Sequence, residues 1–504
     1  MNILEKLYFY AQNQGQNLAI RSGDSCLTYQ ELDLYSGRLA NFIQRSCGTD
    51  KSPVVVYGHK QIEMILCFLA AVKSGRPYCP LDISMPDSRI SDIIDAASPS
   101  MIFDLEQKRD GAISLKQLRD ILENNEEMVD PACQVKGDET FYIIFTSGST
   151  GTPKGVQITA NNLNHYLEWS VDLGTRRADK QGKSFLNQAP FSFDLSVMDL
   201  YTCLASGGAL YLLDKETQMD FKKLIPALAQ SGAAVWVSTP SFADMCMADK
   251  KFSADLMPDL ETFLFCGETL TNDTALKLME RFPKAVIMNT YGPTESTVAV
   301  TEIQVTRQLA AKNRPLPVGK AKPGTLLEIH REDGSLAQAG ESGEIIIAGD
   351  TVSAGYFGRP DLTGKAFFTS MKGGQPHRAY RTGDKGYLDE AGTLHYEGRI
   401  DLQVKLNGYR IEIEDIEKNM IRLEEIVHAV VVPNMKDGKV KSLTAFVTGG
   451  DRPDSGFRYS KAVKDRLKAF LPAYMIPKKI VHMESLPMNH NGKVDRKKLG
   501  GMVR

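Results

Sequence analysis

The chain has 504 residues, which is too long for a single hydrophobic core, so we expect at least two domains. Apolar residues make up 42% of it and charged residues 24%, an ordinary composition for a globular protein. The formal net charge is −2 and no basic stripe is visible, which argues against nucleic-acid binding.

Targeting and cysteine patterns point to the cytoplasm. The first ten residues do not follow the pattern of a signal peptide, and the longest apolar runs, such as 64–72, are far too short to span a membrane. The cysteines are scattered without a C-x-x-C pair, which argues against a zinc site or a disulfide framework. We therefore predict a cytoplasmic protein that is not an integral membrane protein.

Short β-rich runs alternate with amphipathic segments over most of the chain, starting with a buried strand at 53–57 and a helix over 61–74. Further strands are predicted at 141–145, 209–213, 234–237, 262–265 and 286–288. This alternation predicts an α/β fold with parallel or mixed sheets covered on both faces. From Gly324 to Tyr356 the short strands and glycine-rich turns predict a small β-subdomain.

The pattern changes again near residues 398–401. Beyond it we predict a helix through Ile413 and Met420, strands at 428–432 and 443–447, and a helix with Val463, Leu467 and Phe470 on one face. The tail from 489 to 504 is polar and basic with little periodicity. We therefore predict a large N-terminal domain of α/β subdomains over 1–400 and a smaller α+β lid domain over 401–504.

The stretch Thr146-Ser147-Gly148-Ser149-Thr150-Gly151-Thr152-Pro153-Lys154-Gly155 follows the predicted strand 141–145. Its hydroxyl groups, glycines and lysine suit close contact with a polyphosphate. It does not have the spacing of a Walker A loop. Alone, it could also be a flexible surface turn.

This decapeptide resembles the signature loop of the adenylate-forming superfamily, which includes acyl-CoA synthetases, luciferases and nonribosomal peptide adenylation domains. Other motifs of that superfamily follow in the expected order, at 193–196, 289–295, 343–356, 380–384, 398–401, 408–412 and 491–496. The resemblance implies the superfamily fold, with a mobile C-terminal domain, and an ATP-dependent reaction in which a carboxylate attacks the α-phosphorus.

The resemblance also assigns roles to individual residues. Lys493 would be the catalytic lysine, bridging the substrate carboxylate and the phosphate, and Asp401 would be the hinge of the mobile domain. Thr150 and Glu295 would hold Mg²⁺, an ion that prefers oxygen ligands. The expected ATP contacts are Ser149, Thr150, Asn289, Thr290, Tyr291, Gly292, Pro293, Thr294, Asp384, Arg399 and Lys493. Asp384 would bind the ribose hydroxyls and Tyr291 would flank the adenine.

Asp194 bears on the kind of acid that is activated. A carboxylate beside an acyl pocket is costly unless it pairs with a cation, so it fits the ammonium group of an amino acid better than a fatty acid. The alternative is a helix-capping aspartate. Cys266 stands where the superfamily usually has glycine, and with Val298 it would narrow the substrate site toward a methyl-sized side chain. Asp194, Cys266, Val298 and Lys493 are thus the expected substrate contacts.

The length of 504 residues and the segments at 56–59, 191–200, 266–268 and 471–477 resemble the D-alanine–D-alanyl carrier protein ligase family of lipoteichoic acid alanylation. This implies D-alanine as substrate and, because no phosphopantetheine serine site follows Lys493, a separate carrier protein as thiol acceptor. An adenylation enzyme for glycine, serine or L-alanine is the nearest alternative, since one methylene is worth only about 1–3 kcal/mol in discrimination. An acyl-CoA or aryl-CoA ligase, and a regulatory protein without catalysis, are less favoured alternatives.

Overall fold

The structure is a computed structural model that describes residues 1–146, 153–174, 182–436, 439–450, 456–488 and 494–503. The chain divides into two compact units. The first comprises residues 1–82, 96–145 and 155–398, and the second comprises 83–95, 146–154 and 399–504. Within the described residues, no helix is long and apolar enough to cross a membrane.

Sheet A of the first unit runs in the order β15-β14-β13-β12-β11-β9-β10-β1-β2. From β13 to β1 its neighbours are parallel, and the strands beyond them at both edges pair antiparallel. The strands are β1 (Leu18–Ser22), β2 (Ser25–Thr28), β9 (Ser184–Asn187), β10 (Ala209–Leu212), β11 (Ala233–Ser238), β12 (Thr262–Phe265), β13 (Val286–Tyr291), β14 (Thr301–Gln304) and β15 (Lys320–Ala321). Strands β11 and β12 are buried over their whole length, as expected for parallel strands covered on both faces.

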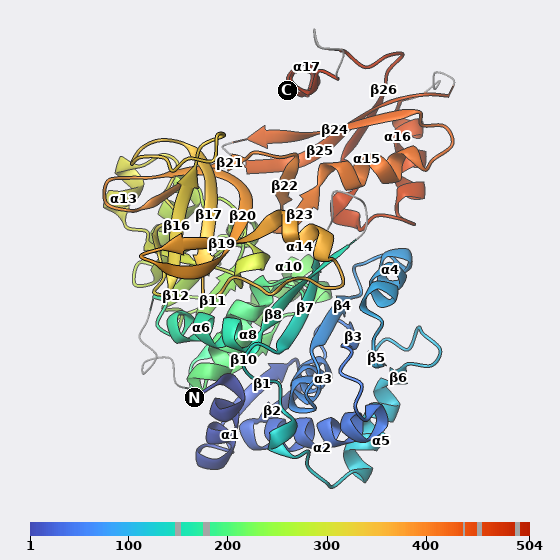
Figure 1. The fold of residues 1–504 in the computed structure, drawn as a ribbon, viewed down its shortest axis with the longest axis vertical. Coiled ribbons are helices and arrows are strands. Elements are labelled where there is room, and N and C mark those ends of the chain that lie inside the picture. Colours follow the sequence, from blue (N-terminus) through green and yellow to red (C-terminus); the bar gives the residue numbers. More distant parts are fainter. Residues whose placement is uncertain (147–152, 175–181, 437–438, 451–455, 489–493, 504) are drawn as a thin grey trace. The chain divides into compact units, whose positions relative to one another are not determined.

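Sheet B runs in the order β18-β8-β7-β4-β3-β5-β6. Its strands are β3 (Val54–Gly58), β4 (Tyr78–Asp82), β5 (Met101–Asp104), β6 (Ile113–Ser114), β7 (Thr140–Thr146), β8 (Lys154–Thr159) and β18 (Gly355–Tyr356). Helix α3 (Ile62–Lys73) contacts β3 and β4 of this sheet and also β1 of sheet A (Figure 1). Helix α8 (Leu195–Ser206) contacts β9, β10 and β11, and its Tyr201 hydroxyl donates to that of Tyr78 on β4. Every residue of α8 and all but Glu63 of α3 are buried, because each helix lies between the two sheets.

The other helices before residue 400 cover the outer faces of the sheets or connect strands. They are α1 (Ile3–Asn13), α2 (Tyr29–Cys47), α4 (Asp87–Ala97), α5 (Leu115–Asn124), α6 (Ala160–Ser170), α9 (Lys215–Met219), α10 (Phe221–Gln230), α11 (Pro240–Cys246), α12 (Asn272–Arg281), α13 (Arg307–Lys312) and α14 (Pro360–Ala366), with 3₁₀ turns η1 (Pro131–Cys133) and η2 (Thr294–Ser296). Their starts follow local capping chemistry. Thr28 and Glu31, for example, form a reciprocal capping box that begins α2.

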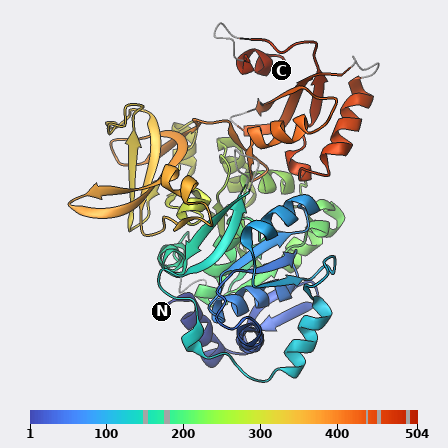
Figure 2. The ribbon, with the colours of Figure 1, turned by 45° about the vertical axis from the view of Figure 1, so that its right-hand side comes forward.

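Sheet C completes the first unit and runs in the order β16-β17-β20-β19, with β21 paired to β20. The strands are β16 (Thr325–His330), β17 (Gly343–Gly349), β19 (Phe367–Lys372), β20 (Gln375–Leu388) and β21 (Leu394–Arg399). Figure 2 shows them in yellow and orange as a compact antiparallel group. The small β-subdomain expected over 324–356 therefore exists but continues to residue 399, because β20 is the partner of three other strands.

The second unit has its own apolar core, formed mainly by Ile411, Ile416, Val431, Ala445 and Leu467. Its strands are β22 (Gln403–Leu406), β23 (Tyr409–Glu412), β24 (His428–Lys436), β25 (Lys439–Thr448) and β26 (Lys479–His482), and its helices are α15 (Ile413–Ile421), α16 (Gly456–Leu467), η3 (Ala473–Met475) and α17 (Arg496–Gly501). Strands β22 and β23 form a hairpin whose Asn407 and Gly408 both have positive φ, the signature of a type I′ turn.

One expectation for the second unit is wrong in detail. Phe470 lies beyond α16, which ends at Leu467, since Pro472 disfavours helical backbone just before it and lacks an N–H. Within the polar tail, the side chain of Asp495 caps the short helix α17 by accepting from Lys498 N–H.

Candidate active site

Strand β13 and the turn after it carry several of the expected nucleotide contacts. The Asn289 amide donates to the Pro317 carbonyl at 2.8 Å. The Thr290 hydroxyl donates to the Phe265 carbonyl at 2.9 Å. Both side chains are therefore engaged in holding the end of the sheet. Gly292 follows, and a Cβ there would lie 2.6 Å from Ala299 Cα, so the turn 292–299 requires glycine at this position.

Tyr291 and Asp384 are brought together from different sheets. The Tyr291 hydroxyl donates to Asp384 Oδ2 at 2.6 Å, and both residues are buried. Burial, and then the Asp384 charge, raise the pKa of Tyr291 well above its ordinary value, so the phenol stays neutral and remains a donor. A carboxylate has about four acceptor positions, which leaves Asp384 able to accept ribose hydroxyls as well.

A bulge in sheet C positions Asp384. The register of β17 against β20 shifts at this point, so that residues 382–384 lie opposite Ile345 alone. Gly383 has a φ of 67°, and the Thr382 hydroxyl donates to the Ile345 carbonyl and accepts from Asp384 N–H. An aspartate after Thr-Gly could also cap a turn, but Asp384 lies within strand β20.

Glu295 is the carboxylate expected to hold Mg²⁺, and it is completely buried in η2, together with Thr294. The Tyr356 hydroxyl donates to Glu295 Oε1 at 2.9 Å. Among the described residues, no cluster of three or more His, Cys, Asp or Glu side chains could hold a metal. One carboxylate fits Mg²⁺, which is usually bound by one or two carboxylates plus water and substrate phosphates rather than by an all-protein cage.

Cys266 and Val298 meet, as expected for two residues of one wall. Both are buried, and Cys266 Sγ lies 3.6 Å from the Val298 carbonyl oxygen. Val298 has a φ of 69°, an outlier for a β-branched residue, and it follows Thr297, which also has positive φ. The Thr297 hydroxyl donates to the Thr351 carbonyl, which helps to maintain this strained turn.

Asp194 is half-buried and occupies the position just before helix α8. Its side chain makes no capping hydrogen bond, and its backbone has helical φ and ψ rather than the extended values of a usual cap. The helix-capping alternative is therefore not supported. Its charge contributes to raising the pKa values of the buried Tyr142 and Tyr166 phenols, although burial is the main cause of both shifts.

The remaining expected site residues either belong to the second unit or are not described by the structure. Ser149, Thr150 and Lys493 lie outside the described residues. Arg399 and Asp401 belong to the second unit, where the guanidinium Nε donates to Asp401 Oδ1 at 2.9 Å. Burial alone would raise the pKa of Asp401. The hydrogen bond and the charge of Arg399 outweigh that effect, so the pKa of Asp401 is lowered.

The segment that follows Lys493 is anchored within the second unit. Arg496 donates through both terminal nitrogens to Glu417 on α15, each at 2.7 Å, and also to the Val431 carbonyl. Met488 and Val494 form an isolated antiparallel bridge. Arg496 and Tyr356 lie within the motifs at 491–496 and 343–356, but the resemblance assigns no role to either residue. Their partners, Glu417 and Glu295, are distant in sequence, and no local signal identifies them.

Comparison with known proteins follows the same division of the chain. The AMP-binding enzyme family matches residues 8–357, and the AMP-binding enzyme C-terminal domain matches 415–493. The D-alanine–D-alanyl carrier protein ligases of Bacillus licheniformis and Bacillus cereus (strain B4264) are each 46% identical to this chain, with 99% of both sequences covered. The chain belongs to the D-alanine–D-alanyl carrier protein ligase family of AMP-binding enzymes.

Solved structures agree with the fold of this ligase family. A holo nonribosomal peptide synthetase protein with adenylation and PCP domains superposes with a TM-score of 0.84 at 26% identity, covering 99% of this chain and 84% of that one. The Vibrio cholerae adenylation domain AlmE, solved with glycyl-adenosine-5′-phosphate, gives 0.80 at 24% identity, covering 99% and 96%. At that identity the likeness to AlmE concerns the fold alone. The predicted α/β fold, with a larger N-terminal and a smaller C-terminal part, is confirmed.

Proposed function

We propose that this chain activates D-alanine with ATP and transfers it to the phosphopantetheine thiol of a separate carrier protein. The observation that carries the proposal is Asp194, a half-buried carboxylate at the start of α8 whose side chain does not cap that helix. A substrate ammonium group is the partner that makes such a carboxylate useful. The full-length identity to ligases named for D-alanine supports the choice of amino acid.

The first half-reaction forms a mixed anhydride. A carboxylate oxygen of D-alanine bonds to the α-phosphorus of ATP, the bond from that phosphorus to the bridging oxygen breaks, and pyrophosphate leaves. Both reactants are anions, so the protein contributes mainly orientation and charge neutralisation. Asp384 and Tyr291 would orient the nucleoside, and Lys493 would supply a positive charge between the two anions.

Glu295 would hold Mg²⁺ together with the phosphate oxygens, with Thr150 as the second expected oxygen ligand. The ion supplies charge neutralisation when bound. Tyr356 would keep the Glu295 carboxylate in one orientation, because its hydroxyl donates to Oε1.

In the second half-reaction the carrier thiol, having lost its proton, attacks the carbonyl carbon of the adenylate, and AMP leaves as the thioester forms. We propose residues 1–400 as the adenylation core and 401–504 as a lid domain that turns about Asp401 between the half-reactions. In one orientation the lid presents Lys493. In the other, the hairpin segment 406–409 serves the thiol. Release of the Arg399–Asp401 pair would accompany this rotation.

The decisive experiment is ATP–pyrophosphate exchange with a panel of D-alanine, L-alanine, glycine and serine. We expect the highest kcat/KM with D-alanine. Exchange with L-alanine and none with D-alanine would contradict the substrate assignment and leave adenylation intact. Thioester formation on a phosphopantetheinylated carrier, with the carrier's apo form as control, tests the second half-reaction.

A further inference from the structure

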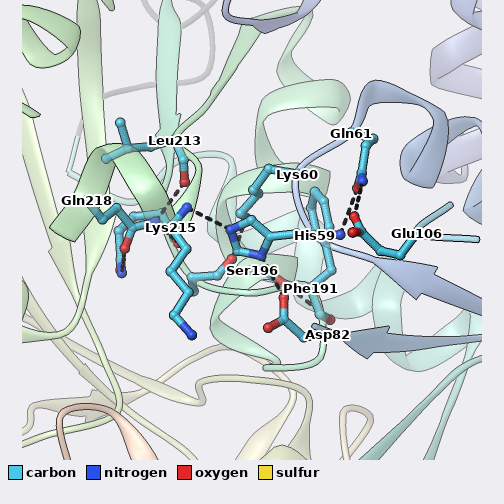
Figure 3. Close-up of polar contacts among 12 residues, drawn as sticks. His59, Lys60, Gln61, Asp82, Glu106, Phe191, Ser196, Leu213, Lys215 and Gln218 are labelled. Carbon is cyan, nitrogen blue, oxygen red and sulfur yellow. Dashed lines mark hydrogen bonds and ion pairs between the residues drawn. The ribbon is translucent and has the colours of Figure 1, made fainter. Parts of the chain in front are cut away.

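A buried lysine outside the expected site lies directly behind the segment that leads to Asp194. Lys60 follows strand β3, and its neighbours hold the backbone on both sides (Figure 3). His59 Nε2 accepts from Lys215 N–H at 2.8 Å, so the ring proton resides on Nδ1, which donates to Asp82 Oδ2 at 2.7 Å. His59 N–H donates to Gln61 Oε1 at 2.7 Å. These hydrogen bonds of the neighbouring His59 fix the backbone at Lys60.

The Lys60 ammonium is 3% exposed and binds the start of the segment between β9 and α8. It donates to the Asn187 side-chain oxygen and to the Ala189 carbonyl, and it lies 4.1 Å from the centroid of the Phe191 ring. Burial lowers its pKa to about 8, and nearby Asp199 and Asp82 oppose that shift. These contacts engage the first half of segment 187–194.

The second half of the segment is held through helix α8. The Asn187 amide donates to Asp199 Oδ1 at 2.5 Å, and Asp199 is completely buried on α8, the helix that begins immediately after Asp194. The Ser196 hydroxyl donates to the Phe193 carbonyl at 2.6 Å. Asn187 therefore links the Lys60 ammonium to Asp199. Segment 187–194 is held by Lys60 at its start and is followed by the helix that carries Asp199, so it is fixed on both sides of Asp194.

We propose that Lys60 is a positioning residue for Asp194. The ammonium holds the Ala189 carbonyl and the Phe191 ring so that the Asp194 carboxylate stays where it can pair with the substrate's ammonium. Removing one charged member of a buried polar network costs stability by itself, so a positioning role is shown by a rise in the KM for D-alanine and not by a loss of stability. A binding group needs a second layer of contacts to hold its geometry, and Lys60 supplies it. This inference rests on the proposed amino-acid activation.

The test is Lys60→Met in the full chain, assayed by ATP–pyrophosphate exchange. We expect the KM for D-alanine to rise by about tenfold or more, because small displacements of a binding group are costly, while the KM for ATP stays within about twofold. Lys73→Met is the matched control. Lys73 is also buried, at 4% exposed, and pairs with Asp33 and Ser36 away from the segment. It should lose stability without a change in the KM for D-alanine.

Phe191→Leu provides a second variant if Lys60→Met does not fold, because it keeps the hydrogen bonds of Lys60 to Asn187 and Ala189 and removes only the ring near the ammonium. We expect its KM for D-alanine to rise by about two- to fivefold, in line with a modest cation–π contact. An unchanged KM for D-alanine in these variants, or an equal rise in Lys73→Met, would overturn the positioning role. If the wild type uses another amino acid, the proposed substrate is wrong, and the same ratios measured with that amino acid still test Lys60.

Discussion

The nucleotide region and the amino-acid region are organised in different ways. In the nucleotide region the expected functional groups pair directly with other site residues, as Tyr291 does with Asp384 and Tyr356 with Glu295. In the proposed amino-acid region, Asp194 lies on a segment whose first half is held by Lys60, through Asn187 and Ala189. The nucleotide contacts are thus held by hydrogen bonds within the site, and the amino-acid contacts by a layer outside it.

This difference follows from the ligands. A nucleotide is the same in every member of such a family, so rigid polar pairs between separate elements of the fold are useful. An amino acid is recognised by one charge and by the shape of a small side chain, a shape that Cys266 and Val298 are proposed to select. Changes in the first region should therefore alter ATP binding alone, and changes in the second should alter amino-acid binding alone.

The largest expected effect comes from Asp194→Asn. Loss of the charge that pairs with the substrate ammonium costs about 2–5 kcal/mol, which corresponds to a rise in the KM for D-alanine of about 30-fold or more. Asp384→Asn is the matched variant in the other region and should instead raise the KM for ATP, by about 10- to 150-fold. Steady-state exchange with each substrate varied in turn measures both. If the two variants raise the same KM, the division between the regions is wrong.

A smaller effect is expected from Tyr356→Phe. Removal of one hydrogen bond to Glu295 costs about 0.5–1.5 kcal/mol, so the Mg²⁺ concentration for half-maximal exchange should rise by about 2- to 12-fold. Tyr291→Phe is the control, since it removes an equivalent hydroxyl from Asp384 and should change the KM for ATP. A Mg²⁺ titration that is the same in Tyr356→Phe and wild type would show that this hydroxyl does not support the metal ligand.

Much of the nucleotide region could be predicted because its residues are consecutive. Asn289 to Glu295 lie on one strand and its turn, and the strand predicted over 262–265 matches β12. The pairing of Tyr291 with Asp384 could not be predicted, because it depends on a bulge in β20 and on the packing of two sheets. Such geometry has no local pattern in the sequence.

The support of the amino-acid region was missed for a related reason. Lys60 is a single lysine after a buried strand, and composition alone makes it look like an exposed charge. Its partners, Asn187 and Asp199, lie on a strand and a helix more than a hundred residues away. Only the packing of α8 between the sheets brings them to it. Phe470 shows the opposite error. The apolar pattern in the sequence continues to Phe470, but helix α16 ends at Leu467.

The smallest effect is expected from Cys266→Ala, which removes the sulfur that lies against the Val298 carbonyl. If this sulfur narrows the substrate site, D-2-aminobutyrate, which is one methylene longer than D-alanine, should be used better. A methylene is worth about 1–3 kcal/mol in discrimination, and the substitution recovers only part of this if the site relaxes incompletely. The kcat/KM for D-2-aminobutyrate relative to that for D-alanine should therefore rise by about two- to fivefold. Cys246→Ala is the control, because Cys246 is equally buried but belongs to a separate core cluster. If the ratio of kcat/KM for D-2-aminobutyrate to that for D-alanine is the same in both variants, Cys266 only fills the core. Selection for a small side chain would then depend mainly on the turn at Val298.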